Sequence, residues 1–297
     1  MDDFVYFKKV QGMAQRTIKD YEKTFKAFLE FSNIIIFDMA RVKHSLLEFF
    51  ATKTDKSPAT FNVPYSNLNS LFIWAVNENI IANNPIKELG LKKKRDEGKV
   101  RHIDESIIKR LLNILDISTY AGLRDYAIIL LSLDSGIRPK EAFSLKVDDV
   151  DYICNSLTIN REIAKTRRSR TLPLSPQTVE ILRKLISVKL KEWDNYLFTT
   201  VEGYQMTTDR WEKRLRGYST RINAKITPYD LRHTFAIMFL RNNGNVFALQ
   251  QELGHADLTM TKRYVKLAES DLKNQHAIAS PVNVFVKRTT RIQKLFK

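Results

Sequence analysis

The sequence predicts a mainly α-helical protein with a small antiparallel β-sheet, divided into two domains. Apolar residues recur at helical spacing through most of the chain, and two short β-branched segments lie close together within 157–174. A charged run without any apolar residue, at 92–99, separates two stretches of this pattern. Because domains usually have about 100–150 residues, a chain of 297 residues is long enough to build two cores.

The first domain is predicted to be a set of short helices. Thr17, Tyr21, Phe25 and Phe28 form an apolar stripe with the spacing of one helix face. Further apolar periodicity predicts helices across 42–50 and 58–76. The second of these begins with a serine N-cap and a proline at the first helical position, and Asn-Asn-Pro at 83–85 ends the pattern.

The charged run is predicted to be a linker, and we place the domain boundary after residue 96. The run can be read as solvated surface, or as a segment that follows a phosphate backbone, since basic side chains neutralise phosphates. Its candidate DNA-binding residues are Lys92, Lys93, Lys94 and Arg95.

The second domain, residues 97–297, is predicted to combine helices with a hairpin. Asp104 is the expected cap of a helix, and the nearly all-apolar segment 126–133 predicts a buried one. Alternating β-branched segments at 157–160 and 170–174 predict two strands joined by a turn at 166–169. Helical periodicity returns at 178–190, after Pro228 and around Tyr264.

The composition favours a polyanionic partner. The net charge of +16 indicates nucleic acid, although a merely soluble basic protein remains an alternative. The single cysteine, Cys154, excludes an intrachain disulfide and a cysteine-rich zinc site and fits a cytoplasmic location. We expect no membrane association, because no apolar run reaches about 18 residues. No GxxxxGK[ST] motif occurs, so we expect no ATP. The sequence also lacks a carboxylate cluster, so we expect no metal, and we expect no other cofactor.

Five residues suggest phosphodiester chemistry when they are taken together. Arginines can hold a pentavalent phosphate, a tyrosine can attack it, and a lysine can protonate the leaving oxygen. Taken singly, each has an ordinary structural explanation, such as a salt bridge for an arginine or a structural hydrogen bond for a histidine. The five candidates are Arg138, Lys165, Arg232, His255 and Tyr264.

Two neighbouring groups are expected to support these candidates. Glu141, three positions after Arg138, can orient that guanidinium. The turn around Lys165 carries Arg167, Arg168 and Arg170, which we expect to face DNA. By contrast, we expect His233 to pack or cap rather than to join the site.

Four segments, in order, make the sequence resemble the tyrosine recombinase (phage integrase) family. SGIRPKEAFSLKVDDVD is similar to the first arginine box, and AKTRRSRTLPL to the catalytic-lysine hairpin. TPYDLRHTFA and LGHADLTMTKRYVKL are similar to the second arginine and nucleophile boxes. The resemblance spans the chain and implies a helical, SAM-like core-binding domain over 1–96 followed by a catalytic domain.

The resemblance also implies a reaction and its participants. Tyr264 would form a 3′-phosphotyrosyl link, Arg138 and Arg232 would hold the non-bridging oxygens, His255 would contact the phosphate and Lys165 would act as general acid. The implied partners are double-stranded DNA with paired core sites, further copies of the chain in a tetramer, and an accessory DNA-bending or excision factor. Family members bury a C-terminal segment in a neighbouring protomer, which makes the tail from residue 280 a candidate for that contact.

One position departs from the family pattern. Tyr229 stands three positions before Arg232, where the family usually has histidine. A phenol can hydrogen-bond the phosphate or Tyr264, but its ordinary pKa of about 10 makes it a poor base.

The expected function is site-specific DNA recombination by a mobile-element integrase or transposon recombinase. A recombinase of the Xer type, which resolves chromosome or plasmid dimers, is the first alternative. A type IB topoisomerase and a catalytically silent DNA-binding relative are the others.

Overall fold

The computed structural model describes residues 2–33, 38–95, 101–268 and 272–285. The chain divides into two compact units, Met1–Gly98 and Lys99–Lys297. The domain boundary expected after residue 96 and the basic end of the tail, from residue 286, lie outside the described residues.

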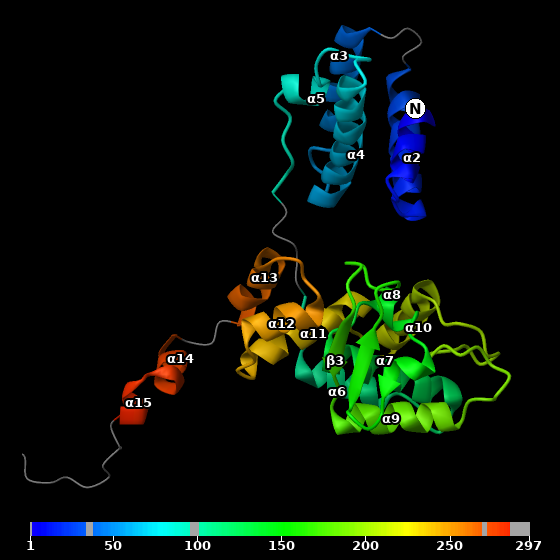
Figure 1. Ribbon diagram of the computed structural model, residues 1–297, viewed down its shortest axis with the longest axis vertical. Helices are drawn as coiled ribbons and strands as arrows, with labels where there is room; N and C mark the ends of the chain where they lie inside the picture. Colours follow the sequence, from blue (N-terminus) through cyan, green and yellow to red (C-terminus); the bar gives the residue numbers. More distant parts are fainter. Residues whose placement is uncertain (1, 34–37, 96–100, 269–271, 286–297) are drawn as a thin grey trace, which may run out of the picture. The chain divides into compact units, whose positions relative to one another are not determined.

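The first unit is helical, and its core is rich in aromatic rings. Tyr21, Phe25 and Phe28 are buried as the apolar stripe predicts, but Ile18 rather than Thr17 continues that stripe. Ser57 caps its helix by accepting a hydrogen bond from the Thr60 amide. The helices of this unit are α1 (Asp2–Val10), α2 (Gln15–Ser32), α3 (Met39–Ala51), α4 (Pro58–Asn77) and α5 (Pro85–Glu88) (Figure 1).

The second unit is built around the buried helix α7, which contacts both α9 and α11. Its core continues from α7 into the sheet and into α10, where Trp211 is fully buried. The helices are α6 (Glu105–Asn113), α7 (Tyr120–Ser135), α8 (Pro139–Ala142), the 3₁₀ helix η1 (Val147–Asp149), α9 (Pro176–Ser187), α10 (Thr208–Arg221), α11 (Pro228–Arg241), α12 (Val246–Leu253), α13 (Leu258–Ala268), α14 (Leu272–Ala279) and α15 (Val282–Phe285).

The sheet of the second unit is antiparallel, with the strand order β1–β2–β3. Leu157 on β2 lies opposite Leu172 on β3, and both side chains are buried. The hairpin predicted from the β-branched segments is therefore present, while the two-residue strand β1 was not predicted. The strands are β1 (Val150–Asp151), β2 (Ser156–Ile159) and β3 (Arg170–Pro173).

The fold class is thus mainly α with a small antiparallel sheet, as the sequence predicts. Within the described part of the chain, every helix is too short or too polar to cross a bilayer.

Candidate active site

Arg138 is positioned by the sharp end of α7. Gly136 ends that helix in the left-handed region, at φ +59°, and a Cβ there would lie 2.3 Å from the Phe235 ring. Pro139 then begins α8, so Arg138 sits in the extended residue before a new helix. Glycine at 136 therefore allows both the turn and the close approach of α11.

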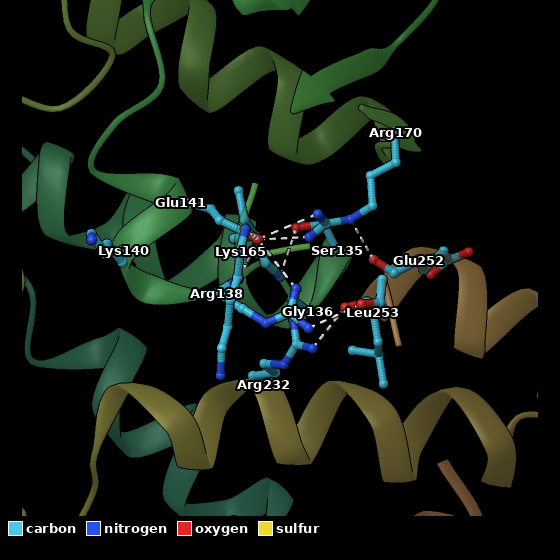
Figure 2. A network of polar contacts seen from close by, with 12 residues as sticks. Ser135, Gly136, Arg138, Lys140, Glu141, Lys165, Arg170, Arg232, Glu252 and Leu253 are labelled. Atoms are coloured by element: carbon cyan, nitrogen blue, oxygen red, sulfur yellow. Dashed lines mark hydrogen bonds and ion pairs between the residues drawn. The ribbon is translucent and has the colours of Figure 1, made fainter. Parts of the chain in front are cut away.

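Glu141 forms ion pairs with two arginines, Arg138 and Arg170 (Figure 2). Its carboxylate is 2% exposed and lies 3.1 Å from Arg138 Nη1 and 2.6 Å from Arg170 Nη2. The Lys165 amide also donates to Glu141 Oε1, at 3.3 Å. Burial disfavours the charged carboxylate, but the hydrogen bond and charge of Arg170 and the charge of Arg138 outweigh it and lower the pKa of Glu141. Glu141 thus links the first arginine box to the hairpin.

Lys165 lies in the loop between β2 and β3, with an exposed side chain. Its backbone is held next to Arg138 by the bond to Glu141. Arg167 and Arg168, in the same loop, are exposed as well. The hairpin therefore presents these three cations at the surface beside the site.

Arg170 occupies a different environment from the one expected. Its side chain is 11% exposed and is held by Glu141 and by the carbonyl of Glu252. Arg170 is therefore mostly buried and connects Glu141 to the end of α12. In this position it holds Glu141 in place, and it is not an exposed cation facing DNA.

The C-terminal end of α12 holds three arginines. The last carbonyls of a helix lack intrahelical donors and carry the negative end of its dipole, so guanidinium groups bind well there. Three successive carbonyls accept hydrogen bonds, at 3.1, 2.8 and 3.1 Å, in the pairs Glu252 with Arg170, Leu253 with Arg232, and Gly254 with Arg138. Helix α12 thus fixes the spacing between the two arginine boxes.

Arg232, on α11, is the most deeply buried cation of the site, at 4% exposure. It donates to the carbonyls of Gly136 and Leu253, and it lies 3.2 Å from His255 Nε2. Burial, with the positive charge of Arg138, lowers its pKa to about 9, so the guanidinium is still protonated at neutral pH. A bound phosphate would supply the negative charge that stabilises this buried guanidinium.

His255 follows Gly254, which ends α12 in the left-handed region at φ +60°. A guanidinium can only donate, so Nε2 facing Arg232 is the unprotonated nitrogen and Nδ1 carries the hydrogen toward Thr261 Oγ1, at 2.9 Å. Burial, Arg232 and Arg138 together lower the pKa of His255 to about 4. The ring is therefore neutral in the DNA-free protein.

Tyr264, on α13, is 4% exposed and contacts two histidines. The ring of His255 stacks on it at a centroid distance of 6.3 Å and an angle of 9°. The Tyr264 hydroxyl is 2.8 Å from His233 Nδ1. Burial raises the pKa of Tyr264, against the opposing charges of Arg232, Arg263 and Arg138.

On α11, His233 and not Tyr229 contacts the Tyr264 hydroxyl. Tyr229 is 50% exposed, and its hydroxyl has no hydrogen-bond partner among the described residues. His233, which we expected to pack or cap, contacts the candidate nucleophile instead. The sequence did contain a signal: His233 comes four residues after Tyr229, one helical turn along the same face.

The basic linker residues have two kinds of environment. Lys94 Nζ donates to the carbonyls of Lys53, Thr54 and Lys56, so this lysine closes the turn after α3. Lys92, Lys93 and Arg95 are exposed.

A cavity opens beside the site, between the hairpin and α12. Its volume is about 870 Å³, and its lining includes Arg168, Gln250 and His255. The candidate site is therefore reached from the surface next to the exposed hairpin cations.

The chain is similar to known proteins over most of its length. The model of the phage integrase family matches residues 101–271, more than half of the chain. The chain is 27% identical to tyrosine recombinase XerD of Listeria innocua, over 92% of this chain and 96% of the relative. It is 26% identical to tyrosine recombinase XerC of Bacillus subtilis, over 93% and 94%.

Solved structures show the same fold. The Tn1549 transposon integrase, in complex with a circular intermediate DNA, superposes with a TM-score of 0.72 at 19% identity, covering 92% of this chain and 97% of that one. XerH bound to palindromic difH substrate superposes with a TM-score of 0.71 at 21% identity, covering 92% and 82%. With the family match over residues 101–271, these findings show that the chain belongs to the phage integrase family of tyrosine recombinases.

Proposed function

We propose that this protein is a site-specific DNA recombinase that cleaves and rejoins strands through Tyr264. The observation that carries the proposal is one network at the end of α12, in which Arg138 and Arg232 bind successive carbonyls and Arg232 contacts His255, whose ring stacks on Tyr264. In the proposed reaction Tyr264 Oη attacks the phosphorus, forming a 3′-phosphotyrosyl bond, and the 5′ oxygen leaves.

The arginines supply the electrostatic part of the reaction. Arg138 and Arg232 each have five N–H donors, and the carbonyls and carboxylate that hold them use only some of these. The remaining donors can bind the non-bridging oxygens as negative charge develops, and the fixed guanidiniums need little reorganisation to do so.

Lys165 is proposed to protonate the leaving 5′ oxygen. Its exposed side chain extends from a backbone fixed next to Arg138, on a loop that can approach a bound strand. The phosphotyrosyl bond conserves the energy of the phosphodiester, so ligation to a partner strand requires no nucleotide cofactor.

His255 is proposed to donate to the phosphate. Burial and the nearby guanidiniums of Arg232 and Arg138 lower the pKa of His255 to about 4, so Nε2 carries no proton at neutral pH. A bound phosphate would reverse this balance and raise the pKa of the ring. His255 would then be charged only when the substrate is in place.

DNA binding follows from charge. The net charge of +16 and the exposed cations Lys92, Lys93, Arg95, Arg167 and Arg168 fit contacts to a phosphate backbone. We propose that the protein acts in the cytoplasm on paired core sites as a tetramer, with an accessory DNA-bending or excision factor as a further candidate partner.

We favour a mobile-element integrase or transposon recombinase, because Tyr229 departs from the family pattern. Xer-type dimer resolution is the second candidate. It is favoured by the full-length similarity to XerD and XerC relatives.

A two-site plasmid assay tests the proposed function. A supercoiled plasmid carrying two directly repeated copies of DNA from the flanks of the protein's own gene should be converted into two circles. Relaxation without exchange would indicate a topoisomerase, and binding without cleavage would indicate a silent relative. Plasmids with matched random inserts serve as the control.

The Tyr229→His variant is expected to cleave at the wild-type rate or faster. The phenol is half exposed and is not hydrogen-bonded to any described residue, so restoring the family's usual histidine removes no observed contact. Single-turnover cleavage of a nicked core site measures the effect, with Tyr229→Phe as the matched control. A loss of about tenfold or more in both variants would show that the phenol has a role of its own.

A further inference from the structure

The side chain of His233 extends from α11 to the nucleophile on α13. Its Nδ1 is 2.8 Å from Tyr264 Oη, and the two rings are tilted by 45° at a centroid distance of 5.6 Å. This is the distance of a direct proton-transfer contact. Arg232, the preceding residue, contacts His255 instead, so consecutive residues of α11 contact two different residues of the site.

The surroundings of His233 favour a neutral ring. Burial and the charge of Arg232 lower its pKa, and Asp230 opposes this effect. From α13 the ring faces Tyr264, which is itself uncharged because burial raises its pKa. At neutral pH, Nδ1 can therefore accept a proton.

The other bases near Tyr264 are committed to different partners. His255 uses Nε2 for Arg232 and Nδ1 for Thr261. The Glu141 carboxylate is neutralised by two arginines.

Asp230 and Tyr229 are no better placed. The Asp230 carboxylate accepts from the Thr227 amide, at 2.8 Å, and so caps α11. Tyr229 is half exposed and weakly basic. Among the described residues of the site, His233 is thus the base that contacts the reacting hydroxyl and can accept its proton.

We propose that His233 is the general base of strand cleavage, an inference that rests on the proposed recombinase function. As the Tyr264 Oη–P bond forms, the O–H bond breaks and its proton moves to His233 Nδ1, giving an imidazolium. The P–O5′ bond breaks, and the 5′ oxygen takes a proton from Lys165. In ligation the 5′ hydroxyl of the partner strand gives its proton to Lys165 as it attacks the phosphorus, the Tyr264 Oη–P bond breaks, and His233 returns its proton to Oη.

His233→Asn tests this step, because the Asn amide can occupy the position of Nδ1 and hydrogen-bond but cannot take up a proton. Single-turnover formation of the covalent adduct is measured on a nicked core site between about pH 6 and 9. The wild-type rate should be nearly flat above neutral pH, because the base is already deprotonated. The variant should be about 10²–10⁴-fold slower at pH 7, and its rate should rise about tenfold per pH unit as tyrosine ionises in bulk solvent.

A second substrate separates the base from the acid. Sulfur in place of the bridging 5′ oxygen gives a thiolate leaving group, which needs no proton because thiols have an ordinary pKa of about 8.5. This substrate should rescue Lys165→Ala and leave His233→Asn slow. Rescue of His233→Asn to the wild-type rate would place the defect in leaving-group protonation and overturn the proposal.

His44→Asn is the matched control, since His44 lies on α3 in the first unit, exposed and paired with Glu48. Wild-type affinity for the core site would show that each variant is folded. A wild-type rate and pH profile in His233→Asn would refute the general-base role while leaving the recombinase function intact. Absence of a Tyr264-dependent adduct in the wild type would instead refute the proposed function, and the inference with it.

Discussion

The Glu141→Gln variant is expected to lose about 3 kcal/mol of stability in the second unit and about 10²–10³-fold in cleavage rate. Glu141 is 2% exposed and pairs with Arg138 and Arg170, which are each 11% exposed. A neutral amide would leave two mostly buried guanidiniums without their counter-charge. Since Arg138 is proposed to bind the non-bridging oxygens of the phosphate, its displacement should slow cleavage as well.

The stability part of this prediction depends on pH. The two arginines lower the pKa of Glu141 in the folded protein relative to the unfolded chain. The unfolded chain therefore binds the proton more tightly, and the stabilisation is complete above the unfolded pKa of about 4.3. It is lost as the pH falls through the folded pKa, so the difference between wild type and variant should be full at pH 7 and shrink below about pH 4.

Urea unfolding followed by tryptophan fluorescence measures this difference. A Trp74→Phe background leaves Trp193 and Trp211, both in the second unit, as the reporters. Glu162→Gln is the matched control, because Glu162 is an exposed glutamate in the loop of the hairpin that Glu141 contacts. Equal stability of Glu141→Gln and Glu162→Gln at pH 7 would contradict the account of the buried network.

Local patterns predicted much of the fold. The serine–proline pair at 57–58 marks the start of α4, and the β-branched segments predict β2 and β3 to within a residue. These signals act over one or two turns of chain, so they can be recognised without tertiary information.

The sequence did not predict elements that have few apolar residues or that depend on contacts between residues distant in the chain. Helix α10 has a largely polar sequence, and its apolar positions Trp211 and Leu215 are too few to stand out before their burial is known. Strand β1 has two residues and exists only through its pairing with β2. The role of α12 as the support for three arginines depends on backbone carbonyls, which every residue carries and no motif marks.

In the site as well, the sequence predicted which residues take part better than it predicted where their side chains lie. The motifs named Arg138, Arg232, His255 and Tyr264, which the structure brings together. Side-chain direction could not be read in the same way. The sequence led us to expect an exposed Arg170 and a packed His233, whereas Arg170 is paired with Glu141 and His233 contacts the nucleophile. Both differences arise where residues distant in sequence meet, at α11 with α13 and at the hairpin with α8.

The Tyr264→Phe variant is expected to form no covalent DNA adduct, because the phenol oxygen is the proposed attacking atom. Tyr264 is 4% exposed, so Phe should fill the same space and keep the His255 stacking while losing the bond to His233. DNA affinity should stay near that of the wild type, which makes the variant a test of chemistry alone.

Covalent trapping tests the central claim most directly. Nicked DNA from the flanks of the protein's own gene is incubated with wild type or Tyr264→Phe, denatured in SDS, and the adduct is digested and mapped. We expect a wild-type adduct joining Tyr264 to a 3′ phosphate, with a free 5′ hydroxyl on the released strand, and none in the variant. An adduct that persists in Tyr264→Phe, or salt-sensitive binding of wild type to one fragment with no adduct, would contradict it.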